Sequence, residues 1–155
     1  DEKEMKYVRL ELPQDLLFAI MVPDFPVSTE KSRAVLPDSY SRADVVFNAS
    51  RAALLVASML TGKYENFDIA MEDRVHQPYR AALIPNMENI FAHAKEYGAA
   101  ATYLSGAGST LMAMVRREEA EALGRKMSAY LAALPHNWEL TLLEPERTGV
   151  KVEIV

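Results

Sequence analysis

The sequence predicts an α+β domain built around an antiparallel sheet. Short apolar runs of strand length are interspersed with longer segments whose apolar residues recur at helical spacing. Their order is strand, two helices, two strands, helix and two strands, which departs from the regular alternation that gives a parallel sheet. No linker, internal repeat or low-complexity tract interrupts this order. We therefore expect residues 1–155 to form a single domain.

The first predicted elements are two strands and a short helix. Residues 7–12 alternate weakly between apolar and polar side chains, which indicates a strand with one face in water. Residues 16–22 form a nearly continuous apolar run and are predicted to be a central strand. A short helix is expected to begin after Ser28-Thr29 and to run to Leu36, where Pro37 stops it.

A long helix is predicted from Ser41 to Thr61. Ser41 and Asp44 resemble a capping box at its start, and Gly62 suits the left-handed position just past its end. Its apolar residues lie nearly all round, so we expect it to be the most buried helix. Its longest apolar stretch, residues 52–60, is well short of the roughly 20 residues of a membrane span, which favours a core helix.

The second half of the chain contains two more predicted helices and four predicted strands. A short helical segment and a polar stretch come first, over residues 64–71 and 72–77. The helices are expected from Asn86 to Gly98 and from Arg117 to Leu134, where Pro135 ends the second one. The strands are expected over residues 99–104, 111–115, 138–143 and 150–155.

Composition restricts the class of protein. Half of the residues are hydrophobic and a quarter are charged, as in soluble globular domains. The net charge of −5 argues against a nonspecific nucleic-acid binder, which would carry a basic stripe. There is no cysteine, and the charged first residues show no secretory signal, so we expect a cytoplasmic protein without disulfides.

The loop from Ser105 to Thr110 (Ser-Gly-Ala-Gly-Ser-Thr) is the most informative motif. Two glycines one residue apart let the backbone turn sharply and direct several N–H groups toward one point. Such a concavity favours an anion such as a phosphate or a carboxylate. A glycine-rich hairpin turn without any ligand explains the same residues equally well.

Four stretches, in their order and spacing, resemble the GHMP-superfamily kinases and most closely the homoserine kinases. Residues 104–110 are similar to the superfamily's third motif, the glycine-rich loop beside the transferred phosphate. Three stretches point to homoserine kinases in particular: Val22–Arg33 with Val35–Pro37, Ala43–Asn48 leading into Arg51, and His76–Arg80 (His-Gln-Pro-Tyr-Arg) running into Leu83–Pro85. The resemblance extends over essentially the whole chain from about Leu16 onward.

The resemblance implies the C-terminal domain of such a kinase, a ferredoxin-like sandwich in which the helices pack on one face of the antiparallel sheet. No Pro-x-x-x-Gly-Leu-Gly-Ser-Ser-type phosphate loop occurs in the sequence, so the N-terminal ATP-binding domain is expected to be absent from this chain. ATP and Mg²⁺ would be bound mainly by that absent domain. We therefore expect no catalytic residue and no metal site here, and no activity from this chain alone.

Thr29, Arg33 and Arg80 are the candidate substrate-binding residues. Thr29 and Arg33 stand four positions apart and share one face of a predicted helix. An arginine can bind a carboxylate through two charge-assisted hydrogen bonds, although a solvated surface arginine is the simpler reading of the residues alone. The resemblance matches all three positions to residues that contact the amino-acid substrate. It also places Ser105, Gly106, Ala107, Gly108 and Ser109 near the phosphate.

Other polar residues are weaker candidates. His76 could serve as a general base, but a lone histidine more often packs or forms a hydrogen bond. Asn48 is a second-tier site residue whose amide could equally well bond to a neighbouring loop. Asp24 and Asp68 stand alone, and no paired carboxylates have the spacing of metal ligands.

The resemblance implies that the whole enzyme phosphorylates the side-chain hydroxyl of L-homoserine with ATP, giving O-phospho-L-homoserine for threonine biosynthesis. The expected partners are homoserine and the missing N-terminal domain, with no nucleic acid and no membrane. A homodimer is left open. So are two alternative functions: a GHMP kinase for another small alcohol, and a noncatalytic amino-acid-binding or regulatory module of ferredoxin-like fold.

Overall fold

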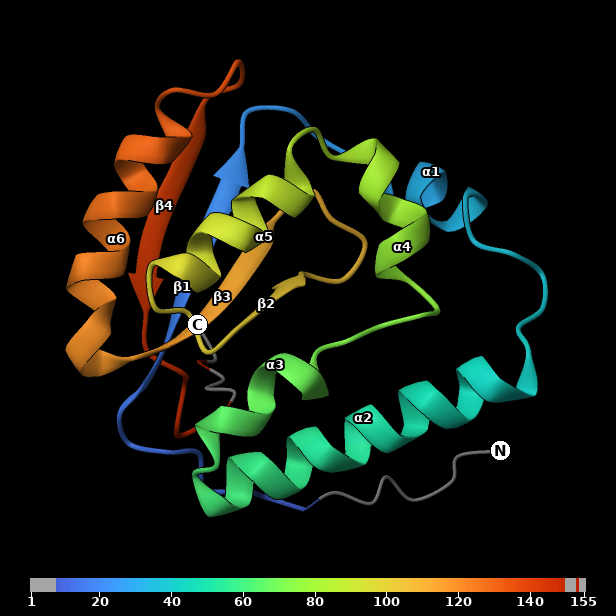
Figure 1. The fold of residues 1–155 in the computed structure, drawn as a ribbon, viewed down its shortest axis with the longest axis horizontal. Coiled ribbons are helices and arrows are strands. Elements are labelled where there is room, and N and C mark those ends of the chain that lie inside the picture. Colours follow the sequence, from blue (N-terminus) through green and yellow to red (C-terminus); the bar gives the residue numbers. More distant parts are fainter. Residues whose placement is uncertain (1–7, 150–152, 154–155) are drawn as a thin grey trace.

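The computed structural model describes residues 8–149 and residue 153. A four-stranded antiparallel sheet in the order β2-β3-β1-β4 forms its centre (Figure 1). The strands are β1 (Leu16–Pro23), β2 (Ala101–Leu104), β3 (Leu111–Arg116) and β4 (Trp138–Leu143). Helical elements connect β1 to β2 and one helix connects β3 to β4, so this is the strand order of a ferredoxin-like fold. The expected α+β class is therefore confirmed.

Two helices cover one face of the sheet. They are α5 (Met87–Glu96), which crosses the strands in Figure 1, and α6 (Arg117–Leu131), which lies beside β4 there. The main core lies between them and the strands. Leu17, Ala19 and Met21 of β1 face Ile90 of α5 and Leu123 of α6, and all five are at most 8 % exposed. The even-numbered residues of β1 point to the other face, as strand alternation requires.

Among the described residues, the other face of the sheet is covered mainly at one end. There η1 (Tyr64–Asn66) and α3 (Phe67–Ala70) place Tyr64 and Phe67 against Leu16, Ala101 and Met114. The Tyr64 hydroxyl donates to Asp15 at 2.9 Å, and the Arg116 guanidinium lies 3.9 Å from the Tyr64 ring. On this face, Val22 and, near the opposite end of β1, Leu143, which pairs with Phe18, stay 43 % and 47 % exposed. Part of this face of the sheet is therefore open.

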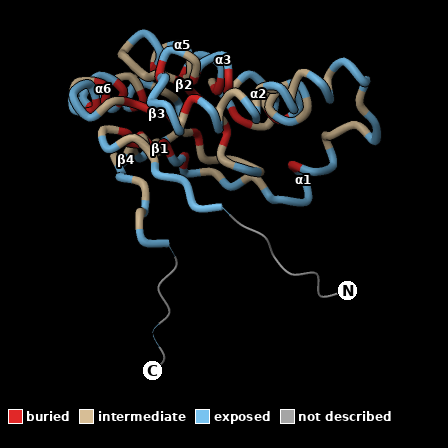
Figure 2. The backbone as a smooth tube through the Cα atoms, turned by 90° about the horizontal axis from the view of Figure 1, so that it is seen from below, coloured by how far each residue is buried: buried red, intermediate tan, exposed pale blue. Residues whose placement is uncertain are grey.

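The long helix α2 (Arg42–Thr61) begins and ends as the sequence predicts. The Ser41 hydroxyl accepts the Asp44 N–H at its start, and Gly62 adopts a left-handed φ of 65° after its end. However, the expectation that α2 is the most buried helix is wrong. Ser58 is its only buried residue, and Val45, Val46, Val56 and Leu60 are 47–62 % exposed (Figure 2). Only Leu55 and Met59 pack beside the smaller apolar cluster, so most of the apolar surface of α2 has no cover among the described residues.

By length and composition alone, α2 is also apolar enough to cross a membrane, with a mean hydropathy of 1.4 over 18 residues. One such helix is weak support for a span. Asn48 and Arg51 of α2 form hydrogen bonds with Asp73 and Glu72, so this side of the helix is attached to the domain. The sequence-based exclusion of a span considered only residues 52–60, whereas the whole helix meets the criterion.

Two further sequence expectations differ from the structure. Residues 8–12 form no strand, and the carbonyls of Leu12 and Pro13 accept hydrogen bonds from Arg147 instead. The expected strand over residues 150–155 lies outside the described residues. The helix α6 ends at Leu131 rather than Leu134, and the chain continues in tighter turns.

Short helices connect the long ones. The first, α1 (Thr29–Ala34), follows β1, and its N-cap is Ser28, whose hydroxyl accepts the Lys31 N–H. Residues 77–83, for which no helix was expected, form α4 (Gln77–Arg80) and η2 (Ala81–Leu83). Pro78 suits the first turn of α4, where its missing N–H costs no hydrogen bond. These short helices bring α1, α4 and the glycine-rich loop to one end of the sheet (Figure 1).

Candidate functional site

A cavity of about 540 Å³ lies where α1, α2, α4 and the glycine-rich loop meet. This is within the range of roughly 300–1,000 Å³ that is common for small-molecule sites. Five of the predicted site residues line it, namely Thr29, Arg33, Arg80, Gly106 and Ala107. The other three, Ser105, Gly108 and Ser109, belong to the same loop but do not line the cavity. The structure therefore brings together residues that are 77 positions apart in the printed sequence, from Thr29 to Gly106.

Arg80 is buried and already bonded to the protein. Its Nε donates to the Ser32 carbonyl at 3.2 Å, and its Nη1 donates to the Gly106 carbonyl at 2.9 Å. The side chain is only 8 % exposed, yet it lines the cavity. Among the described residues, Nη2 has no partner, so one end of the guanidinium remains for an anionic ligand. Arg80 thus joins α1 to the glycine-rich loop as well as facing the cavity.

The glycine-rich loop is held by side chains from three directions. Besides Arg80, the Ser32 hydroxyl donates to the Ala107 carbonyl at 2.6 Å, and the Ser109 hydroxyl donates to the Phe25 carbonyl at 2.9 Å. The carbonyls of Gly106 and Ala107 are therefore occupied by protein donors. Within the described part of the chain, the N–H groups of Gly106, Ala107 and Ser109 have no acceptor. A loop fixed in this way with free N–H groups can bind an anion without reorganising.

Gly108 is required by the shape of the loop. Its φ is +90°, a conformation that side chains with a Cβ rarely adopt. A Cβ atom at this position would lie 3.0 Å from Ile84 Cδ1 and 3.2 Å from Leu104 Cδ1. The loop backbone therefore packs directly on the main core, which explains the choice of glycine independently of any ligand.

Thr29 and Arg33 stand on the exposed side of α1. Both side chains line the cavity, and neither forms a hydrogen bond or an ion pair with another residue in the described ranges. The helix itself is attached through Ser32, which is fully buried and contacts the glycine-rich loop. Arg33 is thus a cation available at the cavity mouth, opposite the buried Arg80.

The wall across from α1 is made by the segment before α4. The Asp73 carboxylate accepts the N–H groups of Val75, His76 and Gln77 and the Asn48 side-chain amide, at 2.6–3.2 Å. Burial alone would raise the pKa of Asp73, but the backbone and Asn48 hydrogen bonds outweigh it and hold that pKa below its ordinary value. Asn48 also accepts the Arg74 N–H at 3.0 Å, so it acts as a bridge to this segment.

The remaining lining residues add one ion pair and a buried phenol. Arg51 of α2 bonds to Glu72 through Nε and Nη2, at 3.0 and 2.7 Å, which satisfies its charge within the protein. Burial raises the pKa of Tyr103, so this phenol stays neutral. His76 also lines the cavity, and its backbone N–H is bound by Asp73. Arg33 is therefore the arginine of the cavity that is least engaged by the protein.

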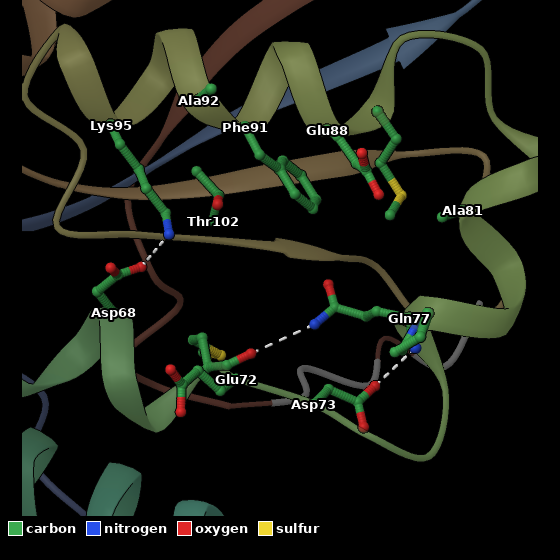
Figure 3. A pocket seen from close by; sticks show the side chains of 13 residues that line it. Asp68, Glu72, Asp73, Gln77, Ala81, Glu88, Phe91, Ala92, Lys95 and Thr102 are labelled. Atoms are coloured by element: carbon green, nitrogen blue, oxygen red, sulfur yellow. Dashed lines mark hydrogen bonds and ion pairs between the residues drawn. The ribbon is translucent and has the colours of Figure 1, made fainter.

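A second cavity of about 480 Å³ lies behind this wall, between α5, α3 and α4 (Figure 3). Met71, Glu72, Asp73 and Gln77 line both cavities. The second cavity contains an ion pair between Lys95 and Asp68. Gln77 stands in the shared wall, and Figure 3 shows its amide reaching across toward the 71–73 segment. Gln77 was not predicted as a site residue, because its position in the His76–Arg80 motif was its only distinguishing feature in the sequence.

No group of three or more His, Cys, Asp or Glu side chains in the described ranges could hold a metal ion. Of the isolated acids considered from the sequence, Asp68 pairs with Lys95, and Asp24 lies 3.6 Å from His136. Neither lines the cavity of Arg33 and Arg80.

Comparison with known proteins agrees with this geometry. The family model described as GHMP kinases C terminal matches residues 52–133, just over half of the chain. A homoserine kinase of Clostridium acetobutylicum is 43 % identical over 98 % of this chain and 51 % of its own length. One from Clostridium kluyveri is 40 % identical over 97 % of this chain and 50 % of its own length. The chain thus spans about half the length of the curated relatives that it matches.

A solved structure supports the same assignment. The crystal structure of homoserine kinase from Cytophaga hutchinsonii superposes with a TM-score of 0.85 and 25 % sequence identity. The superposition covers 92 % of this chain and 45 % of that protein. The family match, the relatives and the fold lead to one conclusion: this chain belongs to the GHMP kinase C-terminal family.

Proposed function

We propose that this chain is the substrate-side half of a homoserine kinase. The whole enzyme would transfer the γ-phosphoryl group of ATP to the side-chain hydroxyl of L-homoserine and form O-phospho-L-homoserine, a step of threonine biosynthesis in the cytoplasm. The observation that carries the proposal is the single cavity shared by Thr29, Arg33, Arg80 and the glycine-rich loop. Relatives that are 40–43 % identical over nearly the whole chain are named homoserine kinase.

The proposed roles follow from the available donors. Arg33 and the free Nη2 of Arg80 bind the homoserine carboxylate, and the Thr29 hydroxyl adds a directional hydrogen bond. This arrangement fixes the substrate at the end remote from the reacting hydroxyl, which contributes orientation rather than bond chemistry. The free N–H groups at Gly106 and Ala107 lie on the same cavity and face developing negative charge on the phosphoryl group.

The described residues of this half suit a phosphate of ATP better than they suit Mg²⁺. The free N–H groups of the glycine-rich loop fit a phosphate that approaches the cavity. The described residues provide no cluster of metal ligands, so we assign no step to Mg²⁺ in this chain. When bound, ATP supplies the transferred phosphoryl group, and the other half of the enzyme would hold most of it.

The proposed partner is the half that the relatives contain and this chain does not span. Its docking surface is the apolar face formed by α2 and the open sheet, with Val45, Val46 and Leu60 on the helix and Val22 and Leu143 on the strands. The helix α2 alone exposes four large apolar side chains, those of Val45, Val46, Val56 and Leu60, and such a cluster is typical of an interaction site. The relatives are about twice as long as the region they share with this chain, which provides a covalently attached occupant.

A titration with matched ligands tests the substrate assignment. L-homoserine should bind the full-length enzyme in calorimetry, whereas 3-amino-1-propanol, which keeps the amine and hydroxyl without the carboxylate, should not. Binding of both with similar affinity would contradict the carboxylate clamp. Phosphorylation of mevalonate but not homoserine would favour the alternative small-alcohol kinase. Homoserine binding without ADP release would favour the regulatory module.

A further inference from the structure

Gln77 joins the end of α3 to the end of β2 through both polar atoms of its side-chain amide. Its side-chain Oε1 accepts the Leu104 N–H at 2.7 Å, and its Nε2 donates to the Met71 carbonyl at 3.3 Å. The amide thus accepts a hydrogen bond from the end of β2 and donates one to the end of α3. Gln77 is half-buried in the wall between the two cavities (Figure 3).

Leu104 is the last residue of β2, which is an edge strand of the sheet. An edge strand leaves backbone N–H groups without a neighbouring strand, and Gln77 satisfies one of them. The next residue, Ser105, opens the glycine-rich loop, whose turn is closed by Ser105 N–H to Thr110 O and Gly108 N–H to Ser105 O, both at 3.0 Å. The bond from Gln77 therefore fixes the point from which the loop departs.

The position of Gln77 is itself fixed by its neighbours. Its backbone N–H donates to the Asp73 carboxylate at 2.7 Å, and Asp73 is held in turn by the Asn48 amide at 2.6 Å. Three residues after Gln77, Arg80 reaches the carbonyl of Gly106. The same four-residue helix α4 therefore contacts the loop at two places, at its base through Gln77 and at its tip through Arg80.

We propose that Gln77 is a positioning residue of the kinase site, which holds the glycine-rich loop in register with Arg80 through its amide bridge between Met71 and Leu104. This inference rests on the proposed function. Gln77 acts through the loop, because its two amide atoms are both bonded to backbone. Its loss should move the free N–H groups relative to the phosphoryl group, whereas α1 with Thr29 and Arg33 stays joined to α4 by the bond from Arg80 to the Ser32 carbonyl.

Kinetics of the full-length enzyme that contains this chain test the proposal. Gln77→Leu removes both hydrogen bonds, and kcat should fall about ten- to a hundredfold, as expected when reacting groups are misplaced by about 1 Å. The KM for homoserine should stay within about threefold, since Arg33 is on α1 and Arg80 keeps its own bond to the Ser32 carbonyl. Gln77→Glu keeps an acceptor for Leu104 and should recover most of kcat. Thr102→Val is the matched control, because Thr102 lies on β2 with Leu104 and lines the second cavity with Gln77, and its side-chain hydroxyl forms no hydrogen bond within the described residues.

Hydrogen exchange of the same full-length variants reports the positioning separately from activity. The peptide covering residues 99–111 should exchange faster in Gln77→Leu than in wild type or Thr102→Val. Faster exchange with an unchanged kcat would overturn the positioning role and leave the proposed function standing. A tenfold rise in the KM for homoserine with unchanged kcat would also overturn it. A wild-type enzyme that does not phosphorylate homoserine would overturn the proposed function itself, and with it any role of Gln77 in that reaction.

Discussion

Arg80 and Arg33 should respond differently to the same substitution, because only Arg80 is part of the framework. In Arg80→Ala, two hydrogen bonds from a charged donor are lost, each worth about 1.5–3 kcal/mol. The bond to Ser32 O is buried, so water cannot replace it, whereas Gly106 is exposed and its carbonyl can be hydrated. We therefore expect the free energy of unfolding to fall by about 2–4 kcal/mol. For Arg33→Ala, an exposed side chain without a protein partner in the described ranges, the change should stay within about 0.5 kcal/mol.

Both variants should lose homoserine affinity. Removing one charge-assisted clamp costs about 1.5–3 kcal/mol, or roughly ten- to a hundredfold in kcat/KM for homoserine. The KM for ATP should change much less, since neither side chain contacts the nucleotide in the proposed arrangement. Lysine should rescue Arg33 in part and Arg80 hardly at all, because an ammonium cannot span Ser32 O and Gly106 O while facing a ligand.

The assay combines urea unfolding with steady-state kinetics of the full-length enzyme, varying homoserine and ATP in turn. Equal unfolding free energies for Arg33→Ala and Arg80→Ala would refute the structural role assigned to Arg80. Wild-type homoserine kinetics in both variants would refute the carboxylate clamp. A shift in the ATP KM without a change for homoserine would show that these arginines serve the nucleotide instead.

Four further outcomes are expected. The 155-residue chain alone should release no ADP from ATP, Mg²⁺ and homoserine in a coupled assay; turnover at the roughly 1–100 per second of kinases would contradict the half-enzyme proposal. The isolated chain should self-associate in sedimentation, and Val46→Asp should reduce this; a strictly monomeric wild type at high concentration would argue against the docking face. Asp73 has a lowered pKa, so its contribution to stability is present above the unfolded value of about 3.9 and is lost as the pH falls through the folded value; urea unfolding from pH 7 to 3 should show less loss for Asp73→Asn, and identical profiles would contradict this. Gly108→Ala should destabilise by about 1–3 kcal/mol, more than Gly106→Ala, whose added Cβ meets nothing within 4 Å; equal losses would refute the packing argument.

The sequence predicted the sheet strands because their signals are local. The run Leu16–Pro23 is apolar on both faces, and the two strands around the glycine-rich loop are joined by a short connection, so period and length were sufficient. Alternation over residues 7–12 misled, since a strand also needs a neighbouring strand, and residues 8–12 pair with none in the described part of the chain. The helix α4 was missed because four residues that include a proline carry no periodic signal.

The misjudged burial of α2 has a different cause. An apolar helix is expected to be covered, but its sequence does not say whether the cover belongs to the same segment of chain. Val45 and Val46 remain exposed, because no described residue packs over them. The apolar composition of α2 therefore predicts that the helix is covered, but it does not predict which segment or protein covers it.

The candidate site was predictable only in part. The family resemblance selected Thr29, Arg33 and Arg80, and the structure places their side chains on one cavity. The sequence did not indicate that two nitrogens of Arg80 would donate hydrogen bonds to backbone carbonyls, because backbone acceptors have no sequence signature. Gln77 stayed hidden for the same reason, since both of its partners are backbone groups.

The attachment of Asn48 to both Asp73 and Arg74 has a thermodynamic consequence for a two-part enzyme. Asn48 belongs to the helix that carries the exposed apolar face, and Asp73 organises the segment that leads to Arg80. In the proposed enzyme, docking of the other half on this helix and occupation of the cavity by a ligand therefore bear on a common set of bonds. Linkage of this kind is reciprocal: whatever factor docking adds to the affinity for the ligand, the ligand adds to the affinity of docking.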